Sequence, residues 1–467
     1  MIPRGRTAKG RLRSSLPDAA PHAPRLLRGK DHGEPFTILG ADVGGLGDRW
    51  VEPFLAANRQ AFRRLDLKEE IRAYPSLRLS VTPGARIGAV PLVSPSTRRV
   101  SAGILIEPRF EWSGLGAVFS AIRFSVPPTL GGHPLVPGSA REVPPWVIAG
   151  PVLERIAGLL LHRRRGFVER REHRSSPRGG VEWTKWATRM CSSAQLTTFP
   201  CRFSEPDDDP VLVANVRWTL SRLASELQTV AATQPGRILI RRAGELMAAI
   251  GPGAELRPAA WSLRSDASDW IRQATEAMTW VAEERGLGGA RVLDGLAWDL
   301  PIDRVWEAWI AGFAADLAGL LGMVARPFDS TRRTLHWEGN AQSMGSLAPD
   351  VQLRGSDRTI WIDAKYKTHL YHLAHQGWAG LSDQMRAEHR ADLHQALAYA
   401  TLADVGSVDT LLVYPLFSPA ARPVSTLATV SSGRRRVRLI LAALPFGFRS
   451  PNQRDEHLRR FRELLAA

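Results

Sequence analysis

The spacing of hydrophobic and polar positions changes along the chain, and each change marks a predicted helix or strand. Apolar residues three and four positions apart predict amphipathic helices, whereas short runs of β-branched and aromatic residues between turn residues predict strands. The two patterns alternate in the C-terminal third, which predicts an α/β domain over residues 291–450. The expected elements are helices at 302–322 and 390–404 and strands near 333–338, 349–354, 359–366, 410–417 and 436–444.

The patterns outside this domain predict two further domains and two terminal segments. Residues 1–35 are basic, rich in proline and glycine and without periodicity, so we expect a disordered arm. Residues 36–145 carry short apolar runs separated by turns and predict a β-rich domain. Residues 146–290 show mainly helical periodicity with many arginines, and residues 451–467 predict a C-terminal helix.

Composition narrows the class of protein. The chain has 467 residues, of which 44% are hydrophobic, so it can build several domains with real cores. Its two cysteines, Cys191 and Cys201, can form neither a disulfide framework nor a multi-cysteine zinc site, which favours a reducing cytoplasm. The longest apolar run, 308–325, carries Asp316 near its middle and predicts a buried helix rather than a membrane span.

The charge of the chain points to a polyanionic partner. The formal net charge is +16, and basicity on this scale most often serves nucleic-acid binding. The densest arginine stretch is 162–180, and within it Arg163, Arg164 and Arg165 are the candidate contacts to a DNA backbone. The alternative is a solvated arginine-rich face with no ligand.

The candidate catalytic residues lie in a segment that contains two of the chain's few lysines. Only six lysines occur in the chain, and two of them, Lys365 and Lys367, closely follow Asp363. Residues 349–367 predict a β-hairpin with the turn residues Gly-Ser-Asp-Arg at its tip. A turn centred between residues 356 and 357 places Asp350 directly opposite Asp363. Lys365 then shares their face of the hairpin.

Two facing carboxylates repel each other and raise each other's pKa, and a divalent cation removes that cost. A few hard oxygen ligands suit Mg²⁺ or Mn²⁺, and such an ion activates water and polarises a phosphate. A lysine ammonium can orient or help to deprotonate that water, whereas a guanidinium stays protonated. We therefore expect Asp350 and Asp363 to bind metal and Lys365 to take part in catalysis. Lys367 has no assigned role.

Two helices add further candidates. Glu307 flanks the apolar stripe of the helix at 302–322, with small residues on its own side, so it can approach the sheet as a third metal ligand. Gln395 and Tyr399 lie four residues apart on one helix face and can bind a phosphate or the catalytic groups. The alternatives are a solvated flank for Glu307, packing for Gln395 and Tyr399, and a surface ion pair for Asp363 and Lys365.

These motifs together resemble a known family. "PD" followed by "DAK", with a glutamate helix upstream and a Q-x-x-x-Y helix downstream, resembles the PD-(D/E)xK nuclease superfamily of Mg²⁺-dependent phosphodiesterases. The longer phrase "APDVQL…TIWIDAKYK…DLHQALAYA…LLVYP" is similar to McrC, the nuclease subunit of the McrBC modification-dependent restriction systems. The resemblance implies a restriction-endonuclease-like core at 291–450 with Asp350, Asp363, Lys365, Glu307, Gln395 and Tyr399 as its site.

The resemblance also implies partners. It predicts a cytoplasmic hetero-oligomer in antiviral defence, in which an AAA+ GTPase or NTPase similar to McrB drives cleavage of DNA. The glycine-rich segment 40–48 lacks the Gly-Lys-Ser/Thr end of a P-loop, so the NTPase would be another chain. We expect the β-rich domain, around 85–125, to dock that NTPase through exposed aromatics such as Phe110 and Trp112. The alternatives are a stand-alone nuclease in repair or transposition, and a catalytically inert DNA-binding scaffold.

Overall fold

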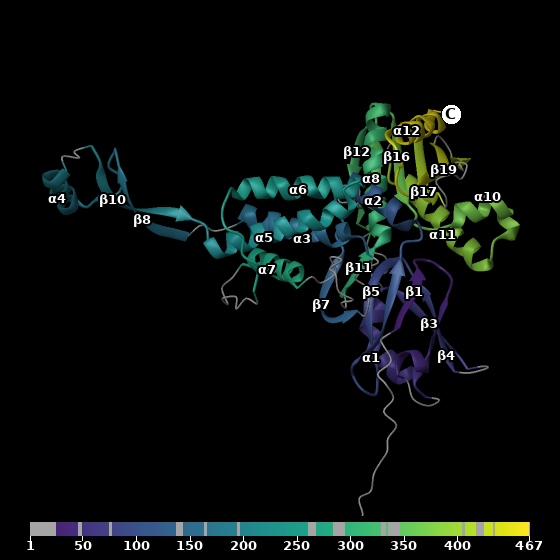
Figure 1. The fold of residues 1–467 in the computed structure, drawn as a ribbon. Coiled ribbons are helices and arrows are strands. Elements are labelled where there is room, and N and C mark those ends of the chain that lie inside the picture. Colours follow the sequence, from purple (N-terminus) through teal and green to yellow (C-terminus); the bar gives the residue numbers. More distant parts are fainter. Residues whose placement is uncertain are drawn as a thin grey trace, which may run out of the picture.

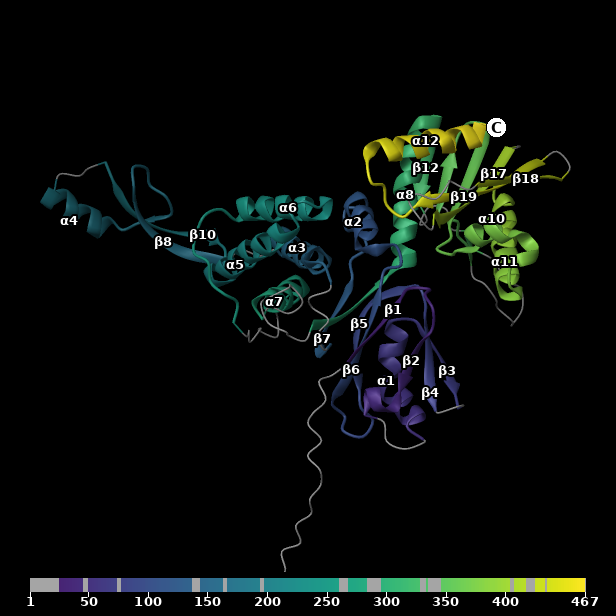
Figure 2. The same ribbon diagram turned by 45° about the vertical axis from the view of Figure 1, so that its right-hand side comes forward.

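The computed structural model shows three bodies, which Figures 1 and 2 display from two sides. An N-terminal body lies below a C-terminal body, and a helical body with a protruding arm extends to the left. The structure describes residues 25–44, 49–73, 77–136, 143–162, 166–193, 197–259, 268–283, 295–327, 333–334, 346–403, 407–416, 425–432 and 435–466. The mixture of sheets and helices confirms a multidomain α/β protein.

The N-terminal body is built on two sheets. The larger sheet has five strands in the order β1 (Arg25–Lys30), β6 (Val100–Glu107), β5 (Arg86–Val93), β11 (Gly295–Pro301) and β7 (Thr129–Val136). The smaller has the order β2 (Phe36–Leu39), β4 (Arg78–Pro83) and β3 (Leu67–Arg72). Helix α1 (Val51–Arg64) packs on β5 and β3, and helix α2 (Glu111–Ala121) follows β6. The β-rich character expected for this region is present.

Two sequence-based boundaries are wrong. Residues 25–35 do not belong to a disordered arm, because β1 pairs in parallel with β6 and buries Leu27. Residues 1–24 lie outside the described residues. The C-terminal domain does not begin at 291, because β11 is a strand of the N-terminal sheet and pairs with β5 and β7. Both errors have one physical cause: the pairing partners lie far away in sequence, where local periodicity carries no information.

The middle body is helical, with a β-arm added. Its helices are α3 (Pro145–His162), α5 (Pro210–Leu227), α6 (Gln234–Ile250) and α7 (Asp269–Ala282). The arginine-rich stretch after α3 forms strand β8 (Gly166–Arg174), which pairs with β10 (Phe199–Asp207). The short strand β9 (Gly180–Val181) and helix α4 (Trp183–Ser193) complete the arm, which projects from the helices in Figure 1.

The C-terminal body is a six-stranded mixed sheet between helices. Its order is β12 (Val324–Pro327), β15 (Val351–Arg354), β16 (Arg358–Ala364), β17 (Ser407–Leu416), β19 (Arg435–Pro445) and β18 (Ser425–Ser432). The three central strands, β16, β17 and β19, run parallel. Strands β13 (Arg333–Thr334) and β14 (Ser346–Leu347) form a separate pair.

Alternate residues of the central strands serve different faces. Leu411 and Val413 join the core that contains α8 (Ile302–Leu321) and α12 (Pro451–Ala466). Leu412 and Tyr414 belong instead to a cluster with residues of α10 (His369–Gly380) and α11 (Asp383–Ala400). The alternation expected of a β-strand therefore sandwiches the sheet between two helix layers. Helix α10 and strands β12 and β18 were not expected from the sequence.

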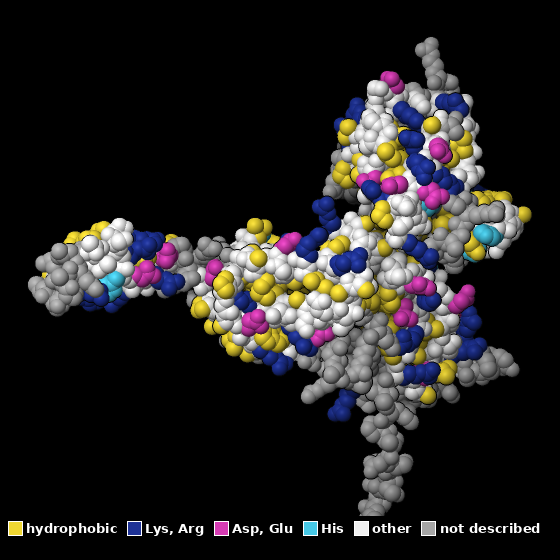
Figure 3. Space-filling model, turned by 45° about the horizontal axis from the view of Figure 1, so that its top comes forward, with side chains coloured by type: hydrophobic (Ala, Val, Ile, Leu, Met, Phe, Trp, Pro, Cys, Tyr) yellow, Lys and Arg dark blue, Asp and Glu magenta, His cyan; other side chains and the backbone are white. Residues whose placement is uncertain are grey.

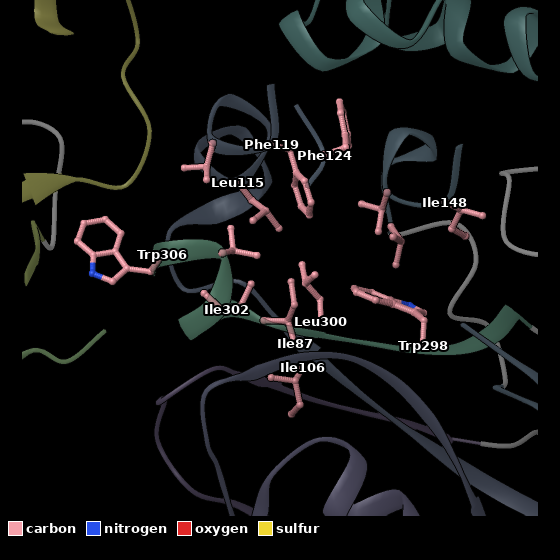
Figure 4. Packing of buried hydrophobic residues seen from close by; sticks show 14 of the residues in the cluster. Ile87, Ile106, Leu115, Phe119, Phe124, Ile148, Trp298, Leu300, Ile302 and Trp306 are labelled. Atoms are coloured by element: carbon pink, nitrogen blue, oxygen red, sulfur yellow. The ribbon is translucent and has the colours of Figure 1, made fainter. Parts of the chain in front are cut away.

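One hydrophobic core runs through the N-terminal and C-terminal bodies. Figure 4 shows Ile87 and Ile106 of the N-terminal sheet close to Leu300 and Ile302, with Trp306 farther along helix α8. The chain passes from β11 directly into α8, and Ile302 N donates a hydrogen bond to the Ala85 carbonyl. The first helix of the candidate nuclease domain is therefore fixed to the N-terminal sheet.

The expectation of exposed aromatics at Phe110 and Trp112 is wrong. The Phe110 ring stacks on Phe446 of the C-terminal body, with the centroids 4.9 Å apart, and the Trp112 ring packs edge-on against Trp146 at 6.2 Å. Both side chains are half-buried against the core. Neither can serve as a free docking surface in this conformation.

Within the described ranges, no helix combines the length and the apolar character needed to cross a bilayer.

Candidate active site

The β15–β16 hairpin places two aspartates opposite each other. Val351 pairs with Ile362, which is the register expected from the turn, so Asp350 and Asp363 occupy the next opposed pair. One carboxylate oxygen of Asp350 accepts a hydrogen bond from the Ala364 backbone N–H at 2.7 Å. Asp363 is buried near the end of a central strand, and Asp350 is half-buried just before β15.

Lys365 joins these carboxylates to helix α11. Its Nζ lies 2.5 Å from Asp363 Oδ2 and donates a hydrogen bond of 2.6 Å to Gln395 Oε1. Gln395 Nε2 donates in turn to the Tyr399 hydroxyl at 2.5 Å, and that hydroxyl donates to the Ala348 carbonyl at 3.3 Å. A continuous series of polar contacts therefore runs from the sheet to α11 and back to the chain before β15.

Glu307 approaches the same place from helix α8. Its carboxylate is half-buried and accepts a hydrogen bond from Arg304 at 3.2 Å. Burial raises the pKa of Glu307, and the charge of Asp363 raises it further. All six residues expected from the sequence thus lie in one region of the C-terminal body.

Burial and mutual repulsion disfavour the charged forms of the two aspartates. Burial raises the pKa of Asp350 to about 7, and the charges of Asp363 and Glu307 add to that effect. Burial also raises the pKa of Asp363, although the Lys365 ammonium opposes the rise. Two desolvated carboxylates facing each other are an arrangement that a divalent cation stabilises.

The donor set fits a hard cation with few protein ligands. Asp350 and Asp363 offer carboxylate oxygens, and Mg²⁺ or Mn²⁺ commonly takes its remaining ligands from water and phosphate. Among the residues that the structure describes, no three His, Cys, Asp or Glu side chains are arranged to hold a metal ion together. Glu307 therefore does not complete a three-carboxylate set here, and its role as a ligand stays a prediction.

Asp392 was not expected from the sequence. It is buried on α11, where its carboxylate accepts a hydrogen bond from Lys367 Nζ at 2.7 Å and lies 3.9 Å from Lys365 Nζ. Burial alone would raise the pKa of Asp392, but the nearby His369 ring, 3.6 Å away, and the hydrogen bond from Lys367 hold it below its usual value. Positions 392, 395 and 399 follow helical spacing, and that periodicity could have identified it.

We expect Asp392→Asn to lower the free energy of unfolding by about 1–3 kcal/mol. The change removes the buried negative charge that accepts the hydrogen bond from Lys367. Urea unfolding of the full chain measures this effect. Asp383→Asn is the matched control, since Asp383 lies in the first turn of the same helix with its side chain 97% exposed. Equal stability of the two variants would contradict a stabilising role for Asp392.

The candidate DNA contacts Arg163, Arg164 and Arg165 lie outside the described residues. In the neighbouring strand β8, arginines are interspersed with glutamates and pair with them. Arg171 lies 2.8 Å from Glu169, and Arg174 lies 3.4 Å from Glu172. Figure 3 shows the same mixture of basic and acidic side chains on the arm at the left. The described part of this stretch is therefore a surface of mixed charge.

No family model and no curated protein matches the chain. Among solved structures, it is similar to a chain in an assembly of Thermococcus gammatolerans McrB AAA+ hexamers with bound McrC, at 13% identity and a TM-score of 0.41, over 94% of this chain and 100% of that one. It is also similar to a chain in the cryo-EM structure of the Thermococcus gammatolerans McrBC complex, at 12% identity and a TM-score of 0.25, over 62% of this chain and 88% of that one.

Proposed function

We propose that this protein is a metal-dependent DNA endonuclease subunit of a McrBC-like restriction system. The observation that carries the proposal is the site itself, in which Asp350 and Asp363 face each other and Lys365 lies 2.5 Å from Asp363. This set of groups matches the PD-(D/E)xK motif that the sequence resembles. Cation-binding carboxylates beside a positioned ammonium are suited to phosphodiester hydrolysis.

Each residue of the site has a distinct task in this proposal. Asp350 and Asp363 would hold Mg²⁺ or Mn²⁺, which supplies charge stabilisation and an acidified water when bound. Lys365 orients the attacking water and moves its proton. Gln395 accepts a hydrogen bond from the Lys365 ammonium and so fixes its direction, and Tyr399 fixes Gln395.

The partner in this proposal is an AAA+ NTPase similar to McrB, with which the chain forms a hetero-oligomer. Support comes from the sequence resemblance to McrC and from segment 40–48, which lacks the lysine of a P-loop. The NTPase would supply the hydrolysis that licenses cutting, and such a system would act in the cytoplasm against foreign DNA.

Cleavage by the full chain tests the proposal. Plasmid DNA is incubated with Mg²⁺ or with a chelator, and each reaction is run with and without the AAA+ partner and NTP. We expect cutting only with metal, and strong stimulation by the partner. Robust NTP-independent cutting by the chain alone would favour a stand-alone nuclease, and no cutting under any condition would favour a DNA-binding scaffold.

The affinity of the site for a divalent cation should decrease as the pH falls below about 7. Because the pKa of Asp350 is raised to about 7, a cation must displace a proton below that pH. We expect the affinity for Mn²⁺ to fall by up to about tenfold per pH unit below 7 and to level off above it. Calorimetric titration at several pH values measures this, and Asp350→Asn should flatten the dependence. A pH-independent affinity in the unaltered chain would contradict the assignment.

A further inference from the structure

The segment between the two lysines forms a tight turn with two different sides. The Lys367 N–H donates a hydrogen bond of 2.8 Å to the Lys365 carbonyl, which makes a three-residue turn centred on Tyr366. The Lys365 N–H donates to the Val413 carbonyl at 2.8 Å and ties the turn to strand β17. Both lysine ammoniums reach the carboxylates of the candidate site, whereas the Tyr366 side chain reaches residues of the N-terminal body.

The Tyr366 side chain ends in a buried polar cluster of the N-terminal body. Its hydroxyl donates a hydrogen bond of 2.7 Å to Asp31 Oδ2, and Asp31 is 0% exposed. The other oxygen of Asp31 accepts from the Arg109 backbone N–H at 2.7 Å. The Arg109 guanidinium lies over the Tyr366 ring, 4.2 Å from its centroid. Burial and the charge of Asp31 raise the pKa of Tyr366, so the hydroxyl keeps its proton and remains a donor.

Aromatic rings from both bodies enclose Tyr366. His32 and Phe110 lie 5.8 and 6.0 Å away on the N-terminal side, measured between ring centroids. Phe446 and Trp306 lie 5.9 and 6.5 Å away on the C-terminal side. Trp306 directly precedes Glu307 in helix α8. The same cluster of rings therefore includes a residue of the turn between Lys365 and Lys367 and a residue of the helix that carries Glu307.

Packing alone does not require these polar groups. A phenylalanine ring would fill the same apolar space, whereas burying Asp31 and Arg109 costs desolvation energy. A directional hydrogen bond to a fixed carboxylate fixes the ring along one axis, and Lys365 is the residue directly before Tyr366 in the chain. Rates of catalysis are sensitive to displacements of about 1 Å, so a small movement of this turn has a large effect.

We propose that Asp31, Arg109 and Tyr366 form a positioning cluster that holds Lys365 against Asp363. The proposal rests on the nuclease function proposed above. It makes Tyr366 a positioning residue, and it makes the N-terminal body a structural part of the active site. A change in the N-terminal body, such as a partner binding to it, would reach the reacting groups through the hydrogen bond that Tyr366 donates to Asp31.

The test uses two conservative variants of the full chain, Tyr366→Phe and Asp31→Asn. Tyr366→Phe keeps the ring and removes the donor, and we expect kcat for DNA cleavage to fall by about 10- to 100-fold with KM and Mn²⁺ affinity unchanged. Tyr371→Phe is the matched control, because that ring packs against His372 and His375 of α10. The double variant should lose no more activity than Tyr366→Phe alone, since both changes break one contact.

A spectroscopic measurement distinguishes a failure of the positioning role from a failure of the proposed nuclease function. The chain has only six lysines, so selective ¹³C labelling of lysine gives a small set of NMR signals, and Lys365→Arg assigns the one from Lys365. We expect Tyr366→Phe to shift the Lys365 signal and to leave that of the distant Lys185 unchanged. An unmoved Lys365 signal would overturn the positioning role even if cleavage fell. A shifted signal would support it even if the unaltered chain cut no DNA.

Discussion

Asp363→Ala should abolish metal-dependent cleavage, with a loss of about 10³-fold or more in rate, while DNA binding stays within about twofold. Asp363 faces Asp350 across the hairpin and lies 2.5 Å from the Lys365 ammonium. Its removal therefore takes away one of the two proposed cation ligands and releases the lysine at the same time. Loss of a cation at the scissile phosphate costs several kcal/mol of transition-state stabilisation, which corresponds to the expected factor.

The measurement is a single-turnover cleavage rate with saturating Mg²⁺, together with a DNA-binding isotherm. Asp357→Ala is the matched control, because Asp357 lies at the exposed tip of the same hairpin. It should cut at the unaltered rate. Cleavage by Asp363→Ala at the rate of this control would contradict the site assignment, and a loss of DNA binding in Asp363→Ala would mean that the residue acts on affinity rather than on chemistry.

Lys365→Arg should lower the cleavage rate by about 10²–10⁴-fold although the positive charge is kept. The Lys365 side chain is only 13% exposed and its ammonium contacts both Asp363 and Gln395, so a planar guanidinium cannot occupy the same position. Arginine also stays protonated and cannot accept a proton from water.

Lys185→Arg provides the comparison for this variant, since Lys185 forms an exposed ion pair with Glu182. Single-turnover rates of the two variants over a range of pH separate charge from proton transfer. A near-normal rate for Lys365→Arg would show that Lys365 is only a structural ion-pair partner of Asp363.

The sequence predicted the register of the β15–β16 hairpin and the shared helix face of Gln395 and Tyr399 correctly, because both are set by local patterns. The turn residues and the two-residue period of a strand set the register of Asp350 against Asp363, and helical spacing put Gln395 and Tyr399 on one face. The same reasoning failed for β1 and β11, whose strands pair with partners far away in sequence. It also missed Asp392, because helical spacing places this residue on the face of Gln395 and Tyr399 but does not show that Lys367 reaches it and that it is buried.

Because β11 continues directly into α8, the C-terminal body is not expected to fold well as an isolated fragment. A cut near residue 291 leaves β11 without β5 and β7, its neighbours in the sheet, and strips the cover from Leu300 and Ile302. Such a fragment would expose an unpaired strand and hydrophobic side chains to solvent, and it would tend to aggregate. A fusion of the C-terminal body to another DNA-binding module would therefore have to include the N-terminal sheet.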